Sequence, residues 1–191
     1  MPPPPPPPPG PGPAQNLRKN FTVSGTVVRA TAYVSGVGWV NAYINGEEVA
    51  PHDRLNPGRT SFDMRQWYMA HDVTKLVKSN GGNVVGILLG RGWQSMTGHT
   101  PAARLMLSIT TSDGKTQHIT TDTSWKGTRA GPIRTNNIYG GETYDSRMEM
   151  TGWSSTGFDD SNWTAAKNAD EFAARKYKVT WQPMQPIRAI E

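Results

Sequence analysis

The feature that most restricts the fold of this chain is the alternation of apolar and polar residues over short stretches. A period of two places the apolar residues on one face of a β-strand. The two clearest series are Val28, Ala30, Ala32 and Val34, followed by Val40, Ala42 and Ile44. They predict two adjacent strands, each with one face in a core.

Turn signals follow these stretches at short intervals. Asn45 and Gly46 both tolerate positive φ, so the chain is expected to reverse there. Ser112-Asp-Gly114 predicts a hairpin between strands at 104–111 and 116–121. Further strands are expected at 61–69 and 83–89, and Asp72 begins a segment typical of one short helix or turn.

Composition supports an all-β chain, because seven Trp and six Tyr residues accompany many β-branched residues. Short strands separated by Gly and Pro predict a β-sandwich or jelly roll with one short helix. Trp125 and Trp163 are expected to fill its core. We expect one folded domain at 17–191, preceded by a disordered polyproline spacer at 1–16.

Residues 2–13 are almost pure proline, with Gly10 and Gly12 as interruptions. Such a segment adopts extended polyproline II and cannot join a hydrogen-bonded sheet. A spacer is the main interpretation. A docking ligand for a proline-recognising groove is the alternative, although no basic residues flank the segment.

Several classes of function are disfavoured. The chain has no cysteine, and its four histidines are too scattered for a local zinc motif, so hard cations are the metals to consider. The net charge of +5 comes from scattered residues, so no nucleic acid partner is expected. No apolar run is long enough for a membrane span, so no membrane partner is expected either. Localisation stays open, with a secreted or extracellular origin favoured over a cytoplasmic one.

A series of short motifs resembles the N-terminal module of bacterial-type α-L-rhamnosidases. The motifs are 34–39 (VSGVGW), 44–46 (ING), 55–58 (LNPG), 60–63 (TSFD), 71–74 (HDVT), 89–93 (LGRGW), 138–147 (IYGGETYDSR), 157–163 (GFDDSNW) and 184–188 (MQPIR). They occur in the family's order and cover about residues 24 to 190. The resemblance implies a galactose-binding-domain-like β-sandwich.

The resemblance also implies a function. In some members the module is similar to a calcium-dependent L-rhamnose-binding domain, and in others it braces the catalytic domain. That catalytic domain is a separate helical barrel, too long for this chain, so no catalytic residue and no enzyme activity are expected. We expect carbohydrate binding of the L-rhamnose type. The alternative is an accessory fragment that packs on a catalytic glycoside hydrolase domain.

Two motifs depart from the family pattern. The segment that resembles Leu-Asp-Pro-Gly-Trp-Thr contains Asn56 and Arg59 at its changed positions, and the one that resembles Leu-Gly-Asn-Gly-Trp contains Arg91. Both segments gain a cation. Calcium affinity is the property that these changes affect most directly.

Calcium takes six to eight oxygen ligands, and vicinal sugar hydroxyls can complete its shell. The candidate ligands are Asn56, Asp63 and Glu142. Asp63 falls near an acidic position of the family pattern, and a turn-capping role is equally compatible with it. Asn56 precedes a proline and is more typical of a turn residue.

Sugar-binding candidates are the flat apolar rings of Trp39 and Trp93, and Arg91 as a donor to hydroxyls. Tyr144 and Asp145 are further candidates within the 138–147 motif. If that motif is a strand, Glu142 and Asp145 point to opposite faces, which disfavours a facing catalytic acid/base pair. A structural salt bridge between Asp145 and Arg147 is the alternative.

Overall fold

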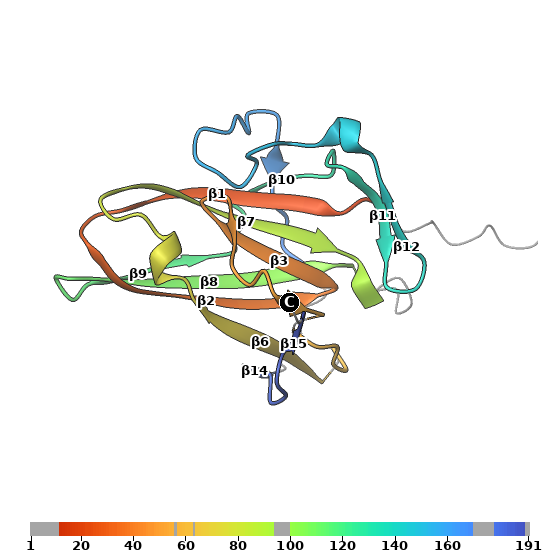
Figure 1. The fold of residues 1–191 in the computed structure, drawn as a ribbon, viewed down its shortest axis with the longest axis horizontal. Helices are drawn as coiled ribbons and strands as arrows, with labels where there is room; N and C mark the ends of the chain where they lie inside the picture. The colour runs from red at the N-terminus through yellow and green to blue at the C-terminus, as the bar shows by residue number, and fades with distance from the viewer. Residues whose placement is uncertain (1–11, 56, 63, 94–99, 170–177, 190–191) are drawn as a thin grey trace, which may run out of the picture.

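The computed structural model describes residues 12–55, 57–62, 64–93, 100–169 and 178–189. Two β-sheets pack face to face as a sandwich (Figure 1). The six-stranded sheet has the order β13 (Thr164–Ala165), β10 (Lys126–Thr128), β1 (Gln15–Val23), β7 (Gly81–Gly90), β3 (Trp39–Ile44), β4 (Glu47–Glu48). The five-stranded sheet has the order β14 (Lys178–Trp181), β6 (Arg65–Asp72), β2 (Val27–Val37), β8 (Ala102–Thr111), β9 (Thr116–Thr120). The predicted all-β sandwich is confirmed.

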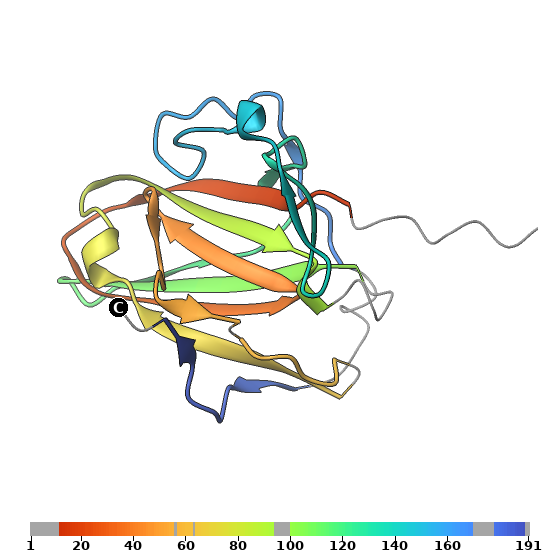
Figure 2. The same ribbon diagram turned by 45° about the vertical axis from the view of Figure 1, so that its right-hand side comes forward.

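Two small ribbons flank the sandwich. The hairpin of β11 (Ile133–Asn137) and β12 (Gly141–Tyr144) stands beside the end of the six-stranded sheet (Figure 2). Strand β15 (Ile187–Arg188) pairs with β5 (Asp53–Arg54) near the end of the chain. The short 3₁₀ helices of the described ranges include η1 (Thr74–Leu76) and η3 (Ser146–Met148). No helix in the described ranges is long and apolar enough to cross a membrane.

The core lies between the inward faces of the two sheets. Alternate residues of β1, β3 and β7 meet those of β2 and β8, and Trp125 is 1% exposed among them. Strands β2 and β3 are consecutive in the chain but belong to opposite sheets. The prediction that Val28 lies on the buried face is wrong, because its side chain is 55% exposed. The β2–β8 register shifts between Val27 and Arg29, and this bulge breaks the period of two.

Both predicted hairpins are present. Asn45 and Gly46 have φ values of 53° and 95°, and Tyr43 pairs with Glu48 across them. Strand β9 pairs with β8 as predicted. The strand expected at 61–69 begins only at Arg65, because the Ser61 carbonyl accepts hydrogen bonds from Met64 and Arg65 in a turn.

The folded region starts earlier than the predicted boundary at residue 17. Strand β1 begins at Gln15, where Gln15 and Asn16 pair with Leu89 and Leu88 of β7. Ala14 is buried, and its N–H donates to the Ile133 carbonyl at 3.1 Å. The sequence shows no apolar alternation here, because one of the two buried side chains, that of Asn16, is polar. Residues 1–11 of the predicted spacer lie outside the described ranges.

Candidate functional site

A cavity of about 330 Å³ lies between the outer face of β3 and β7 and the β11–β12 hairpin. Its apolar lining comes from Ala14, Trp39, Leu88, Ile133 and Ile138. Its polar side chains are Asn41, Asn136, Asn137 and Glu142. The volume is at the lower end of the range of about 300–1,000 Å³ that is usual for small-molecule sites.

Alternation along β3 places the polar groups of this cavity. Val40 and Ala42 point into the core, so Trp39 and Asn41 point outward toward the cavity. The Trp39 indole N–H donates to Asn41 Oδ1 at 2.7 Å, and Asn41 Nδ2 donates to Glu48 Oε1 at 2.8 Å. This chain of hydrogen bonds fixes the Asn41 amide. Burial raises the pKa of Glu48, and the nearby charge of Arg54 opposes that shift.

Asn136 joins the hairpin to the end of β7. Its side chain is buried, and its Oδ1 accepts the backbone N–H of Arg91. Gly90 leaves room for this contact, because a Cβ atom there would lie 2.8 Å from Asn136 Oδ1. Asn136 thereby holds the backbone of Arg91, one of the predicted sugar-binding residues, but Arg91 is not among the residues that line the cavity. Its guanidinium lies beside Gly12, where a Cβ atom would come 3.6 Å from Arg91 Nη2.

Trp93 lies next to this cavity in a second cluster. Its ring contacts Tyr139 edge to face, with ring centroids 5.5 Å apart. The guanidinium carbon of Arg59 lies 5.9 Å from the Trp93 ring centroid in a cation–π contact. Trp39 and Trp93 share a narrow cleft of about 10 Å³, which has no room for a sugar ring.

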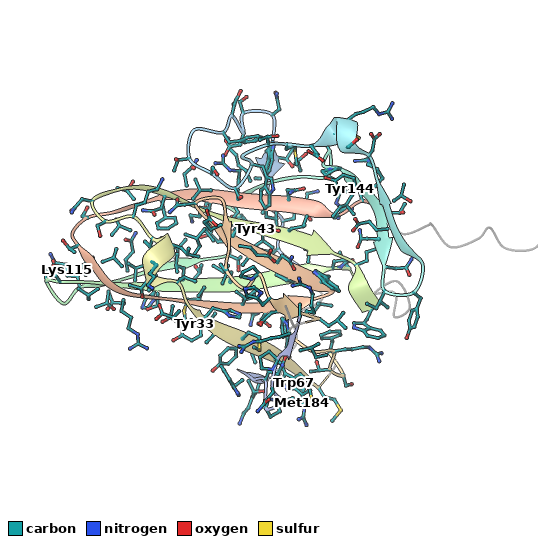
Figure 3. All side chains as sticks on the ribbon, viewed as in Figure 1. Tyr33, Tyr43, Trp67, Lys115, Tyr144 and Met184 are labelled. Atoms are coloured by element: carbon teal, nitrogen blue, oxygen red, sulfur yellow. The ribbon has the colours of Figure 1, made fainter. Side chains whose placement is uncertain are left out.

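The structure does not bring Tyr144 or Asp145 into the same cavity. Tyr144 lines a separate hollow of about 510 Å³ with Tyr43 and Trp153. Its hydroxyl donates to Glu149 Oε1 at 2.8 Å. Figure 3 labels Tyr43 and Tyr144. Strand β12 ends at Tyr144, so Glu142 and Asp145 do not share a strand, and the argument from opposite strand faces does not apply to them.

Asp145 instead caps η3 and forms an ion pair with Arg147. Arg147 Nε and Nη2 donate to its two carboxylate oxygens at 2.8 and 2.7 Å. These hydrogen bonds hold the pKa of Asp145 below its usual value. The contact is the salt bridge that the sequence left open as the alternative role of Asp145.

The calcium prediction depends on residues that the structure describes only in part. Asn56 and Asp63 lie outside the described residues, and Glu142 is exposed on β12. In the described ranges, no three His, Asp or Glu side chains form a metal-binding group. Calcium takes six to eight oxygen ligands, and two of the three candidates lie outside the described residues, so calcium binding stays a prediction.

Sequence reasoning missed four residues as parts of this region: Asn41, Asn136, Tyr139 and Arg59. Asn41 has a signal, because it alternates with Trp39 on the outward face of its strand. Tyr139 and Asn136 lie in or beside the 138–147 motif, but the motif does not show which side chains turn toward the sheet. In the sequence, Arg59 is only a departure from the family pattern. Its contact with Trp93 joins two loops that are distant in the chain.

The family model of the α-L-rhamnosidase N-terminal domain matches residues 25–191. The chain belongs to this family. Among curated relatives, an α-L-rhamnosidase of Alteromonas sp. (strain LOR) is 39% identical over 158 residues, which are 78% of this chain and 17% of that protein. An α-L-rhamnosidase of Formosa agariphila is 34% identical over 192 residues, or 93% of this chain and 20% of that protein.

Solved structures of other proteins have a fold similar to that of this α-L-rhamnosidase N-terminal domain. The Streptomyces avermitilis α-L-rhamnosidase complexed with L-rhamnose has a TM-score of 0.85 at 31% identity, with 95% of this chain and 18% of that chain covered. A Pleurotus ostreatus lectin shares the fold alone, with a TM-score of 0.56 at 19% identity over 82% of this chain and 36% of that chain. The chain therefore spans about a fifth of the length of its rhamnosidase relatives.

Proposed function

We propose that this chain is a non-catalytic carbohydrate-binding module for L-rhamnose or rhamnose-bearing glycans. The observation that carries the proposal is the cavity beside Trp39, which combines an apolar wall with several converging polar groups. The S. avermitilis relative, whose structure was solved with L-rhamnose, supports the ligand class.

The two kinds of lining suit a deoxysugar. A flat indole such as that of Trp39 can cover the apolar face or methyl group of a sugar ring. Amide and carboxylate groups at the rim, from Asn137 and Glu142, can pair with hydroxyls and set the orientation. With one small neutral sugar in such a site, we expect micromolar to millimolar affinity, or roughly −8 to −4 kcal/mol.

The carboxylates of the described residues support a non-catalytic role. Glycoside hydrolysis uses two carboxyl groups across the sugar, one of them an acid with a raised pKa. Asp145 is paired with Arg147, and its pKa is lowered. Glu48 has a raised pKa, but it lines a hollow of only about 30 Å³. Among the described residues that line the cavity, Glu142 is the one carboxylate.

Calcium assistance is a separate part of the proposal, resting on the family resemblance at Asn56, Asp63 and Glu142. Calcium would offer a sugar two coordination positions for vicinal hydroxyls. Asp63→Ala is expected to abolish calcium-dependent binding. Unchanged affinity in this variant would remove calcium from the proposal.

The experiment is a calorimetric titration of L-rhamnose into the purified chain, once with calcium and once with chelator. Heat in both titrations supports sugar binding without metal, and heat with calcium alone supports the assisted form. No heat at millimolar sugar contradicts the proposed function. An aryl rhamnoside incubated with the chain tests catalysis, and turnover would contradict the non-catalytic assignment.

A second candidate function is that of an accessory domain that packs on the catalytic part of an α-L-rhamnosidase. An apolar stripe on the outer face of the five-stranded sheet favours it. The rings of Tyr33 and Tyr68 contact edge to face, with centroids 5.9 Å apart. The rings of Tyr68 and Trp181 do the same, with centroids 6.0 Å apart. Trp181 is 52% exposed, and the exposed Met184 continues the surface (Figure 3). About four-fifths of each rhamnosidase relative lies outside the matched segment and could supply the covering surface.

The two candidates predict different binding partners. Analytical ultracentrifugation of the chain with the S. avermitilis rhamnosidase lacking its matched segment would test the accessory function. Association that is lost in Trp181→Ser supports it. Absence of association, together with a positive rhamnose titration, favours the carbohydrate-binding function.

A further inference from the structure

We infer that the hollow lined by Tyr144 is a second sugar-binding site, which takes an uncharged pyranose unit linked to the rhamnose in the cavity beside Trp39. The inference rests on the proposed function, because it adds a second unit to the ligand of that cavity. It goes beyond a monosaccharide ligand, and it gives a role to side chains that the cavity beside Trp39 does not use.

The hollow has the size and the walls of a small-ligand site. Its volume is about 510 Å³, within the range of about 300–1,000 Å³ that is usual for such sites. Tyr43 lines it from β3 and Tyr144 from β12 (Figure 3), and Trp153 comes from the loop after η3. The rings of Tyr43 and Trp153 contact edge to face, with centroids 5.3 Å apart. Aromatic rings fixed in this way offer flat apolar surfaces to a pyranose ring.

Asn16 supplies a buried amide to this hollow. The residue is 3% exposed, lies on β1 and lines the hollow. A Cβ atom at Gly131 would lie 2.6 Å from Asn16 Oδ1, so the glycine lets the loop close over this side chain. Within the described ranges, no hydrogen bond engages the Asn16 amide. Buried amides nearly always have a partner, and a water that fills this role can be replaced by a sugar hydroxyl.

The cavity and the hollow adjoin on the outer face of the six-stranded sheet. Leu88 and Ile133 line both of them. In the sheet register, Leu88 pairs with Asn41 of β3 on one side and with Asn16 of β1 on the other. One amide therefore lies at each site, and the two backbones are about 10 Å apart across two strand spacings. Two linked pyranose rings can cover this span.

The polar groups of the hollow favour an uncharged sugar unit. Among the described residues that line it, Glu149 is the one carboxylate, and no lysine or arginine is present. The Tyr144 hydroxyl donates to Glu149 Oε1 at 2.8 Å, which holds the exposed tyrosine ring in place. Thr151 and Ser155 add hydroxyls that can donate to or accept from a sugar. An acidic unit would meet a like charge here without a compensating cation.

The test compares three uncharged probes by calorimetry: L-rhamnose, a rhamnosyl-rhamnose disaccharide, and the rhamnosyl-glucose disaccharide rutinose. We expect at least one disaccharide to bind about tenfold or more tightly than L-rhamnose, because its second ring gains an aromatic contact and a hydrogen bond. Disaccharides that bind no more tightly than L-rhamnose would overturn the inference and leave the proposed function standing. Failure of all three probes to bind would contradict the proposed function, and this inference with it.

Asn16→Leu and Tyr144→Ala should each weaken binding of the preferred disaccharide by about tenfold and leave the affinity for L-rhamnose unchanged. Tyr144 is 51% exposed, so its variant tests the hollow even if the buried Asn16 variant does not fold. Asn20→Leu is the matched control, because it removes an exposed amide from the same face of β1 and should keep the preference. Urea unfolding establishes which variants are folded. A disaccharide preference that survives in the folded site variants would overturn the inference.

Discussion

The ring of Trp153 packs directly on the backbone of Gly86 at the centre of β7. A Cβ atom at Gly86 would lie 2.8 Å from Trp153 Cζ3 and 3.1 Å from Ser154 Cβ. Trp153 also contacts Tyr43 edge to face at 5.3 Å and stacks near Trp163. The loop that carries Trp153 therefore covers the outer face of the six-stranded sheet, and the missing side chain at Gly86 allows it to lie there.

Gly86→Ala is expected to destabilise the fold by about 1–3 kcal/mol, because the new methyl group would overlap a packed ring and a neighbouring side chain. Urea unfolding followed by tryptophan fluorescence measures the change. Gly82→Ala is the matched control on the same strand, since a Cβ atom there meets nothing within 4 Å. Equal stability losses in the two variants would contradict the role assigned to Trp153.

Asp160→Asn should destabilise the chain by about 3–5 kcal/mol, because it leaves a buried cation without its partner. The Arg18 side chain is 0% exposed, and its guanidinium pairs with Asp160 and lies 5.4 Å from the Phe158 ring centroid. Asp113→Asn is the control, since its pair with Lys115 is exposed to solvent and should contribute far less to stability than the buried pair does. Chemical denaturation of both variants at neutral pH gives the comparison.

The same ion pair predicts a pH dependence. Burial acts to raise the pKa of Asp160, but hydrogen bonding to Lys126 and the charge of Arg18 outweigh it and lower the pKa. A lowered pKa in the folded state stabilises the fold above the unfolded value of about 3.9, and this stability is lost as the pH falls below it. The gap in unfolding free energy between wild type and Asp160→Asn should therefore be constant from pH 7 to 5 and shrink toward pH 2. A gap that is independent of pH would show that the carboxylate charge is not what stabilises the loop.

Local sequence signals predict the parts of this fold that depend on local chemistry. Asn45 and Gly46 adopt the positive φ angles that their side chains tolerate. Trp125 is buried as expected, with its indole N–H donating to the Thr120 carbonyl at 2.8 Å. The prediction that Val28 is buried is wrong, because an alternating pattern in the sequence does not reveal the β-bulge beside it. Trp163, expected in the core, is half-buried against Trp153 in the covering loop.

The candidate site is less predictable, because its contacts join distant segments. Arg59 meets Trp93 across loops that no local pattern connects, and Arg18 meets Asp160 across 142 residues. The motif at 138–147 marks the right hairpin, yet only the register of β11 and β12 shows that Glu142 reaches the cavity while Asp145 lies beyond the strand. A resemblance identifies such segments, and only packing determines which side chains share a site.

Substitutions of Trp39, which is half-buried, and Trp181, which is exposed, distinguish the two candidate functions. Trp39→Ala removes the indole that lines the cavity and should weaken rhamnose binding by about tenfold or more, the effect of losing a buried apolar surface of this size. Trp181→Ala removes an indole from the opposite sheet and should leave rhamnose affinity unchanged while it abolishes any association with a rhamnosidase catalytic domain. Calorimetry with the sugar and ultracentrifugation with the partner, applied to both variants, measure the two effects. Loss of sugar binding in Trp181→Ala with full binding in Trp39→Ala would move the site to the five-stranded sheet, because the aromatic stripe there would then be the surface that holds the glycan.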